Sequence, residues 1–468
     1  MSVILTPITG ERLAEVSAAD PESFDALFEQ ALAASLVWRK ASPSERGQRL
    51  SEAARRIRAR SDELASLETA NTGKLLSDTR REVTRAAECF EYYAGLADKM
   101  VGDTIAVPGD FHVYTLREPI GVVVGIQPWN VPFYVAARRA APALAFGNAI
   151  VLKPAEETPL TAIELAGILG EVGLPSGLVH VVTGGTDIEQ ALVVDPGAGL
   201  IVFAGSHEGG KTIAKAAATH VVPTVLELGG KSPQLVFEDA DLEAALRGVM
   251  LGAFGACGQM RVAGSRVYVQ RSIYDAFVKR LAERVRRLRV GDPRLDDTQV
   301  GPQTTRTQRD RTLALIESSR REGARVLAAA DVSAERCPAG GFYVGPTAFI
   351  DVDPRMTLMR EEIYGPVVAI TSFRDEEDAV RHAHETHFGL AAGVWTTDIG
   401  RAHRLARDLN VGTVWINSYR IRSHLVPFGG VGLSGYGREG GRDAIETYTR
   451  IKSVWTSLIP GLPPGYSI

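Results

Sequence analysis

The chain has 468 residues, of which 45% are hydrophobic and 23% are charged, and its formal net charge at pH 7 is −4. This composition is typical of a globular protein with enough apolar residues for two or three cores. The mixed charges exclude the strongly basic surface of a nucleic-acid-binding protein, and no apolar run approaches the roughly 18 residues that a membrane span needs.

The first hundred residues predict helices. Acidic residues near the start of 21–28 are typical of a helix N-terminus, and apolar residues recur at helical spacing between 46 and 67. Residues 101–116 then alternate in a β-rich pattern, which predicts an arm with edges that need a partner strand.

From 119 to 237, short β-rich runs alternate with helical runs. Nearly all-apolar strands that alternate with helices indicate a parallel sheet covered on both faces, with a dinucleotide site at the carboxyl ends of its strands. The predicted strands are 120–126, 149–152, 178–182, 200–203 and 225–228, and the predicted helices are 135–145, 160–169 and 212–219.

A second alternating region extends from about residue 230 to 433. It contains a basic helix predicted over 272–289, whose arginines form a solvated face, and strands predicted over 367–373 and 411–417. The Pro- and Gly-rich tail 460–465 predicts an extended segment.

Three cysteines, Cys89, Cys257 and Cys337, are widely spaced and odd in number. A disulfide framework is therefore not expected. Residues 1–20 lack the charged and then apolar pattern of a secretory signal. We expect a cytoplasmic protein, and we predict no metal site.

Two segments follow predicted strands and precede predicted helices. They are Lys153-Pro154-Ala155-Glu156 and Phe203-Ala204-Gly205-Ser206. Gly205 allows the backbone to approach a ligand, and the Ser206 hydroxyl and the free N–H groups of a helix N-terminus can bind a pyrophosphate. These features indicate a dinucleotide cofactor.

Further segments, together with those two, resemble the aldehyde dehydrogenase superfamily over essentially the whole chain. The segments are Pro128-Trp129-Asn130, Glu227-Leu228-Gly229-Gly230-Lys231-Ser232-Pro233, Phe254–Arg266, Glu361–Val367, Pro427–Gly430 and Ser434–Glu439. The resemblance implies an α/β fold with a parallel-sheet dinucleotide-binding domain, a second α/β catalytic domain and a β-flap arm. It also implies NAD-dependent oxidation of an aldehyde.

By this resemblance, Lys153 and Glu156 bind the adenosine ribose. A carboxylate accepts hydrogen bonds from a free 2′-hydroxyl and repels a 2′-phosphate, so Glu156 favours NAD over NADP. Gly205 and Ser206 approach the pyrophosphate. Glu362 binds the nicotinamide ribose, and Tyr364 and Trp129 lie at the nicotinamide end of the same site.

The same resemblance assigns the chemistry. Glu227 is the general base that deprotonates the nucleophile or the hydrolytic water, and Asn130 donates its amide to the carbonyl oxygen where negative charge develops. The attacking cysteine of the family falls on Arg261, and Ala256 replaces the usual asparagine. A guanidinium stays protonated and cannot attack a carbonyl, so the chemistry is not carried over with the fold. Cys257, four residues upstream, is the one nearby thiol and the alternative nucleophile.

Two more arginines point to an anionic ligand. Arg138 and Arg422 match places where arginines of semialdehyde-acid dehydrogenases hold the substrate carboxylate, which a guanidinium binds through two parallel hydrogen bonds. Arg261 itself is a third candidate for anion binding.

The sequence leaves several functions open. In the first, the chain is an NAD-dependent oxidoreductase for an aldehyde carrying an anionic group, with atypical or impaired catalysis. One route for such an enzyme has Glu227 deprotonate an aldehyde hydrate, so that hydride passes directly to NAD. Alternatively, it is a non-catalytic NAD- or anion-binding member of the family, or a Cys-to-Arg variant of an ordinary aldehyde dehydrogenase.

We expect three structural parts. Residues 1–98 and 117–229 form the NAD-binding domain, residues 230–433 form the catalytic domain, and residues 99–116 and 434–468 form the arm and C-terminal tail. The resemblance implies a homodimer or a homotetramer in which the arm pairs with another subunit.

Overall fold

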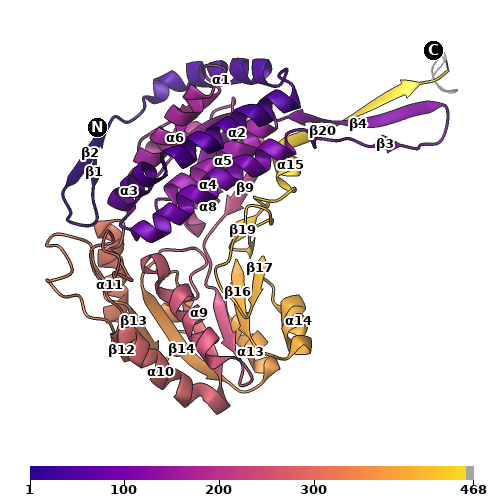
Figure 1. Ribbon diagram of the computed structural model, residues 1–468. Helices are drawn as coiled ribbons and strands as arrows, with labels where there is room; N and C mark the ends of the chain where they lie inside the picture. The colour runs from indigo at the N-terminus through magenta and orange to yellow at the C-terminus, as the bar shows by residue number, and fades with distance from the viewer. Residues whose placement is uncertain (460–468) are drawn as a thin grey trace.

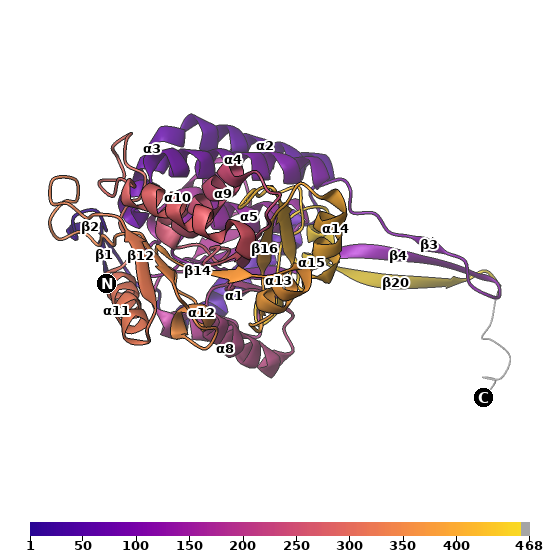
Figure 2. The same cartoon turned by 90° about the horizontal axis from the view of Figure 1, so that it is seen from below.

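The computed structural model describes residues 1–459, which form two α/β lobes and a projecting β arm (Figures 1 and 2). The tail predicted to be extended, 460–465, lies outside the described residues. The α/β class and the parallel sheets predicted from the sequence are confirmed. The domain limits given above stay predictions.

The first lobe is built on a six-stranded sheet with the order β19-β9-β8-β5-β6-β7. Its strands β5 to β9 are parallel and coincide with the predicted β-rich segments, and β19 joins β9 antiparallel. Every residue of β5, β6 and β8 is buried, because helices α1 and α5 pack against β5 and β6 and helix α8 packs against β8. The strands are β5 Val122–Ile126, β6 Ala149–Lys153, β7 Val179–Val181, β8 Leu200–Ala204, β9 Thr224–Glu227 and β19 Gly435–Tyr436.

Eight helices belong to this lobe. The predicted helices 135–145, 160–169 and 212–219 are observed as α5, α6 and α8, although α8 begins earlier because Ser206 caps its N-terminus. The helices are α1 Phe24–Trp38, α2 Pro43–Ala59, α3 Ser61–Thr72, α4 Leu76–Leu96, α5 Pro132–Ala145, α6 Leu160–Glu171, α7 Thr186–Val193 and α8 His207–Ala217.

The second lobe holds a seven-stranded sheet with the order β12-β13-β14-β11-β10-β16-β17, which is parallel except at the β12 edge. The predicted basic helix 272–289 is observed as α10, which ends at Arg286 because the chain turns toward the Val290–Val300 bridge. The strands are β10 Pro233–Val236, β11 Arg266–Gln270, β12 Arg325–Ala329, β13 Thr347–Ile350, β14 Val367–Phe373, β16 Ala391–Trp395 and β17 Thr413–Ile416, and the helices are α9 Leu242–Phe254, α10 Tyr274–Arg286, α11 Arg306–Arg321, α12 Thr357–Arg360, α13 Glu376–Ala383 and α14 Ile399–Asp408.

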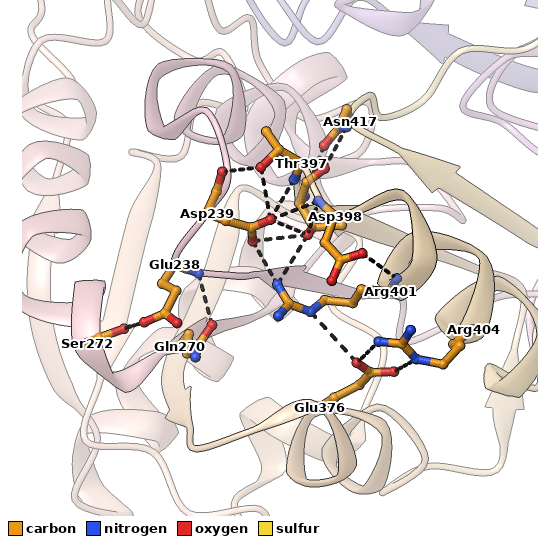
Figure 3. A network of polar contacts seen from close by, with 11 residues as sticks. Glu238, Asp239, Gln270, Ser272, Glu376, Thr397, Asp398, Arg401, Arg404 and Asn417 are labelled. Atoms are coloured by element: carbon orange, nitrogen blue, oxygen red, sulfur yellow. Dashed lines mark hydrogen bonds and ion pairs between the residues drawn. The ribbon is translucent and has the colours of Figure 1, made fainter.

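Polar contacts close the carboxyl-terminal edge of this second sheet (Figure 3). The Asp239 carboxylate, just after β10, accepts hydrogen bonds from the backbone N–H groups of Thr397 and Asp398, both at 2.9 Å, and from Arg401 Nη1 at 2.8 Å. Glu376 pairs with Arg404 at 2.7 Å beside them. These side chains satisfy one another, so the network joins β10 to the loop after β16.

The arm consists of β3 Thr104–Ile105, β4 Phe111–Pro119 and the C-terminal strand β20 Thr449–Ser457, which follows the short helix α15 Ala444–Thr447. β4 and β20 pair antiparallel along their whole length, and Figure 1 shows the arm projecting away from both lobes. Two small strand pairs complete the described fold: the N-terminal hairpin of β1 Ser2–Leu5 and β2 Arg12–Val16, and the pair β15 Phe388–Gly389 and β18 Val431–Gly432. Within residues 1–459, no helix is both long and apolar enough to cross a membrane.

Candidate active site

A cleft of about 830 Å³ lies at the carboxyl ends of β5, β6 and β8. Segments of the second lobe, including the loop before β14, form its other wall. All eight residues that the sequence assigned to cofactor binding or to the oxyanion contact line this cleft: Trp129, Asn130, Lys153, Glu156, Gly205, Ser206, Glu362 and Tyr364.

The end of the cleft that is predicted to bind the adenosine ribose is acidic. Glu156 accepts a hydrogen bond from the Ser2 hydroxyl at 2.6 Å, and Glu157 and Glu189 line the same end. Lys153 Nζ donates to the carbonyl of Pro154 at 2.9 Å. Burial lowers the pKa of Lys153, although the nearby carboxylates oppose the shift.

The turn between β8 and α8 has the geometry expected of a pyrophosphate site. Ser206 is the N-cap of α8, and its hydroxyl accepts a hydrogen bond from the Gly209 N–H at 3.1 Å. A side chain at position 205 would place its Cβ 2.4 Å from the Phe203 ring, so only glycine fits there. The remaining free N–H groups of the helix terminus can bind an anion.

At the end of the cleft that is predicted to hold the nicotinamide, Glu362 and Tyr364 lie together with Trp129. Glu362 accepts a hydrogen bond from the Gly230 N–H at 2.9 Å, and burial raises the pKa of Glu362 to about 7. The rings of Trp129 and Tyr364 lie 6.0 Å apart. Asn130 donates its amide to the carbonyl of Gln259 at 2.6 Å, which fixes the side chain beside the loop that carries Arg261.

The loop with Arg261 begins at the end of α9 with a short helical turn, Gly255–Gly258. Ala256 and Cys257 have φ values of 53° and 54°, in the left-handed region that non-glycine residues seldom adopt. Asparagine tolerates this region better than alanine does, so the replacement at Ala256 adds strain to the loop.

Arg261 is buried and bound to Glu227 through two hydrogen bonds. Its Nη2 lies 2.6 Å from Glu227 Oε2, and its Nη1 lies 2.7 Å from the Glu227 carbonyl oxygen. Arg138 from α5 binds the other carboxylate oxygen, Oε1, and also binds Glu439. Burial alone would raise the pKa of Glu227, but Arg138 and Arg261 outweigh it and hold that pKa well below its ordinary value.

Arg422 lies near this group of arginines and has no anionic partner within residues 1–459. Its guanidinium stacks on the Phe428 ring, 4.0 Å from the ring centre, and no described residue accepts a hydrogen bond from its buried Nε. Burial and the neighbouring charges of Arg261 and Arg138 lower the pKa of Arg422 to about 9. Arg422 therefore remains a cation at neutral pH in a place that favours a negatively charged ligand.

Cys257 lies apart from Glu227 and the cleft. It is buried in a small apolar cluster with Val290, Val300, Cys337 and Tyr343, and burial raises the pKa of its thiol. A protonated, enclosed thiol is a poor nucleophile. The structure therefore disfavours the alternative in which Cys257 replaces the missing cysteine.

Sequence reasoning gave no role to two members of the buried cluster. Glu439 accepts a hydrogen bond from Arg138, and Arg139 lies 3.6 Å from Glu439. Glu439 belongs to the segment Ser434–Glu439, which resembles the family, and this resemblance was the one signal in the sequence that could have indicated a role for it. Nothing in the sequence distinguished Arg139 from a surface arginine, because its burial depends on how α5 packs.

Three comparisons with known proteins bear on this site. A model of the aldehyde dehydrogenase family matches residues 2–454. A betaine aldehyde dehydrogenase from Cereibacter sphaeroides is 46% identical over 458 residues, covering 98% of this chain and 94% of that protein. The human 4-trimethylaminobutyraldehyde dehydrogenase is 41% identical over 454 residues, with coverage of 97% and 92%.

Solved structures of similar proteins give the same result. The betaine aldehyde dehydrogenase from Staphylococcus aureus in complex with NAD⁺ superposes with a TM-score of 0.97 at 35% identity, covering all of this chain and 93% of that one. PnpE in complex with nicotinamide adenine dinucleotide gives a TM-score of 0.96 at 39% identity, with coverage of 99% and 96%. These complexes confirm the prediction that NAD is the cofactor.

Proposed function

Because this chain belongs to the aldehyde dehydrogenase family, we propose that it binds NAD in the cleft described above and that Arg261 has silenced the thiol-dependent oxidation of aldehydes. In the family mechanism, a thiolate attacks the aldehyde, hydride leaves to NAD, and water hydrolyses the thioester. Here the position of the thiolate holds a guanidinium. We infer a NAD-binding protein whose ordinary family turnover is severely impaired.

The observation that carries this proposal is the engagement of Glu227. Both carboxylate oxygens of Glu227 are bound by guanidinium groups, one by Arg261 and one by Arg138. A base must offer a lone pair to the proton it removes, and each charge-assisted hydrogen bond that has to break contributes about 1.5–3 kcal/mol. The depressed pKa further weakens the carboxylate as a base. The same contacts disfavour the hydrate route, which needs Glu227 free.

The intact cleft supports the cofactor half of the proposal. Glu156, Gly205 and Glu362 line it with the chemistry that a dinucleotide needs: an acceptor for ribose hydroxyls, an unobstructed helix N-terminus and a second ribose acceptor. Since the ribose end is rich in carboxylates, a 2′-phosphate would be repelled there. We propose that NAD is preferred over NADP.

The charge of the buried cluster supports an anionic ligand. Three guanidinium groups, those of Arg138, Arg139 and Arg261, pair with the two carboxylates of Glu227 and Glu439. The half-buried Arg422 lies close to them with no anionic partner among the described residues, so the group has two positive charges in excess. Buried charge without a counter-ion is costly. A trimethylamino aldehyde, such as the one in the name of the human relative, would add another cation. A carboxylate-bearing aldehyde would instead neutralise part of the excess.

Calorimetric titration of the full chain with NAD and NADP, combined with an assay for NADH formation, tests the proposal. The aldehydes compared are betaine aldehyde and a semialdehyde that carries a carboxylate. We expect NAD to bind more tightly than NADP, and neither aldehyde to be oxidised at a rate near that of an ordinary family member. Rapid oxidation of either aldehyde would overturn the silencing of the site, and failure to bind NAD would overturn the cofactor role.

A further inference from the structure

We propose that Ser2 positions Glu156 and thereby contributes to the selectivity for NAD, with the N-terminal hairpin holding Ser2 at the cleft. The Ser2 hydroxyl donates to Glu156 Oε1 at 2.6 Å across 154 positions of sequence. This inference rests on the proposed NAD-binding role of Glu156 and goes beyond it by assigning selectivity to a residue of the hairpin.

The turn of the hairpin is fixed to the second lobe. The backbone N–H of Phe342 donates to the carbonyl of Pro7 at 2.9 Å, and the Tyr343 hydroxyl donates to the carbonyl of Ile8 at 3.2 Å. Figure 1 shows the hairpin of β1 and β2 along one edge of the molecule, extending from the first lobe toward the loops beside α11. The hairpin therefore has an anchor that does not depend on Ser2.

The segment that follows the hairpin, residues 17–20, is fixed to the rim of the cleft. The Thr183 hydroxyl donates to the carbonyl of Ser17 at 2.6 Å, and the Ala19 N–H donates to the carbonyl of Thr183 at 2.8 Å. Thr183 directly precedes Gly184 and Gly185, which line the cleft. Two anchors at separate points hold the hairpin, so β1 delivers Ser2 to Glu156 in a defined place.

The second oxygen of Glu156 lies beside the glycines of that rim. A Cβ at position 185 would lie 3.2 Å from Glu156 Oε2, so the glycine keeps this side of the carboxylate open. An ionised carboxylate offers about four acceptor sites. The Ser2 hydroxyl uses one of them and leaves the others for ribose hydroxyls.

Charge at this end makes the placement of Glu156 important for selectivity. Glu157 and Glu189 line the same end of the cleft, whereas the ammonium of Lys153 is bonded to the Pro154 carbonyl. A 2′-phosphate would therefore meet three carboxylates. Of these, Glu156 is the one whose side chain a serine of the hairpin holds in place.

The test compares the affinities of NAD and NADP for Ser2→Ala in the full chain, purified without residues added before Met1. We expect the Kd for NAD to rise about threefold to tenfold, as the net contribution of an ordinary, solvent-exposed hydrogen bond implies, and the preference for NAD over NADP to fall. Ser2→Thr should restore both values because it keeps the hydroxyl. Ser17→Ala is the matched control: it keeps the carbonyl that Thr183 binds and removes only a contact with Met1.

A Ser2→Ala chain with unchanged affinities, or with tighter NAD binding, would overturn the positioning role. Equal losses for NAD and NADP would also overturn it, because they indicate a general loosening of the hairpin. Glu156→Gln separates this inference from the proposed function. If Glu156→Gln weakens NAD while Ser2→Ala does not, only the inference fails; if Glu156→Gln has no effect, the proposed role of Glu156 fails first.

Discussion

Arg261 Nη2 lies 2.6 Å from Oε2 of Glu227, so the residue predicted at the nucleophile position and the residue predicted as the general base form a buried ion pair. In the family mechanism these two positions act in sequence, the base activating the thiol or the water. Under the proposed function, this ion pair removes both roles at once, because position 261 offers no lone pair and Glu227 is engaged.

Replacing the arginine should separate these two effects. Arg261→Cys supplies a thiol and frees one oxygen of Glu227, whereas Arg261→Ser frees the oxygen without supplying a thiol. We expect Arg261→Cys to raise aldehyde-dependent NADH formation at least about 10²-fold over the native chain, since removal of a catalytic nucleophile has effects of that order or larger. Arg261→Ser should stay near the native rate.

Cys257 provides the control for this prediction. The thiol is buried and its pKa is raised, so Cys257→Ala should leave any native activity unchanged. Loss of a robust native rate in Cys257→Ala would show that Cys257 is the nucleophile after all. If Arg261→Ser proved as active as Arg261→Cys, the thiol would not be the missing component.

Arg422 should determine the affinity for anions. Its guanidinium is positively charged and has no anionic partner among the described residues. Arg422→Gln should weaken the binding of a dicarboxylate such as succinate about tenfold, the loss expected for a charge-assisted hydrogen bond. Calorimetry in the presence of NAD measures this affinity. The exposed Arg442→Gln is the control for a general change in charge, and equal effects of the two substitutions would contradict a specific site.

NAD affinity should depend on pH through Glu362. Burial raises the pKa of this carboxyl to about 7, while Lys231, Arg261 and Arg311 oppose the shift. A ribose hydroxyl needs the ionised form as acceptor, so NAD binding should release a proton and strengthen as pH rises through about 7. The stability of the unliganded protein depends on pH in the opposite direction. A carboxyl with a raised folded pKa destabilises the fold as pH rises from the unfolded value, 4.5, toward 7.

Binding isotherms on both sides of pH 7 measure this dependence. Glu362→Gln cannot titrate at this position, so it should remove the pH dependence that Glu362 contributes. The titration of Lys231 must be distinguished from that of Glu362, because burial and Arg266 lower the pKa of Lys231 to about 7 as well. Lys231→Met should leave the pH dependence of NAD affinity in place; if it abolishes the dependence, Lys231 rather than Glu362 is the titrating group.

The arm should join this chain to another copy of itself. Leu116, Ile451 and Trp455 are exposed on β4 and β20, and Trp455 is 60% exposed. Apolar side chains on a projecting two-stranded ribbon are typical of an interface. We expect light scattering at micromolar concentration to give at least a dimer, and Trp455→Lys to shift the protein toward the monomer. A native chain that is monomeric would contradict the predicted exchange of arms.

The sequence by itself determined the parallel strands and the cofactor cleft, because the signals for both are local. Strands such as β5 and β6 are short apolar runs between helices, and Gly205 and Ser206 stand directly at a strand end, so neighbouring residues specify their geometry. The eight residues assigned to the cleft accordingly lie around one cavity. The sequence also predicts that Arg261 replaces a nucleophile, and this stays a prediction.

The tertiary structure decided what Arg261 does, because its partners are distant in sequence. The base Glu227 lies 34 residues away, and Arg138 reaches Glu227 across 89 residues and Glu439 across 301. The sequence assigned Arg138 to the binding of an anionic substrate and assigned no role to Glu439. In the folded chain, Arg138 and Glu439 are both buried, and together with Glu227 they form one ion-pair cluster. The contact between Ser2 and Glu156 has the same origin: two anchors of the hairpin bring a residue of the first strand to a cleft built from later ones.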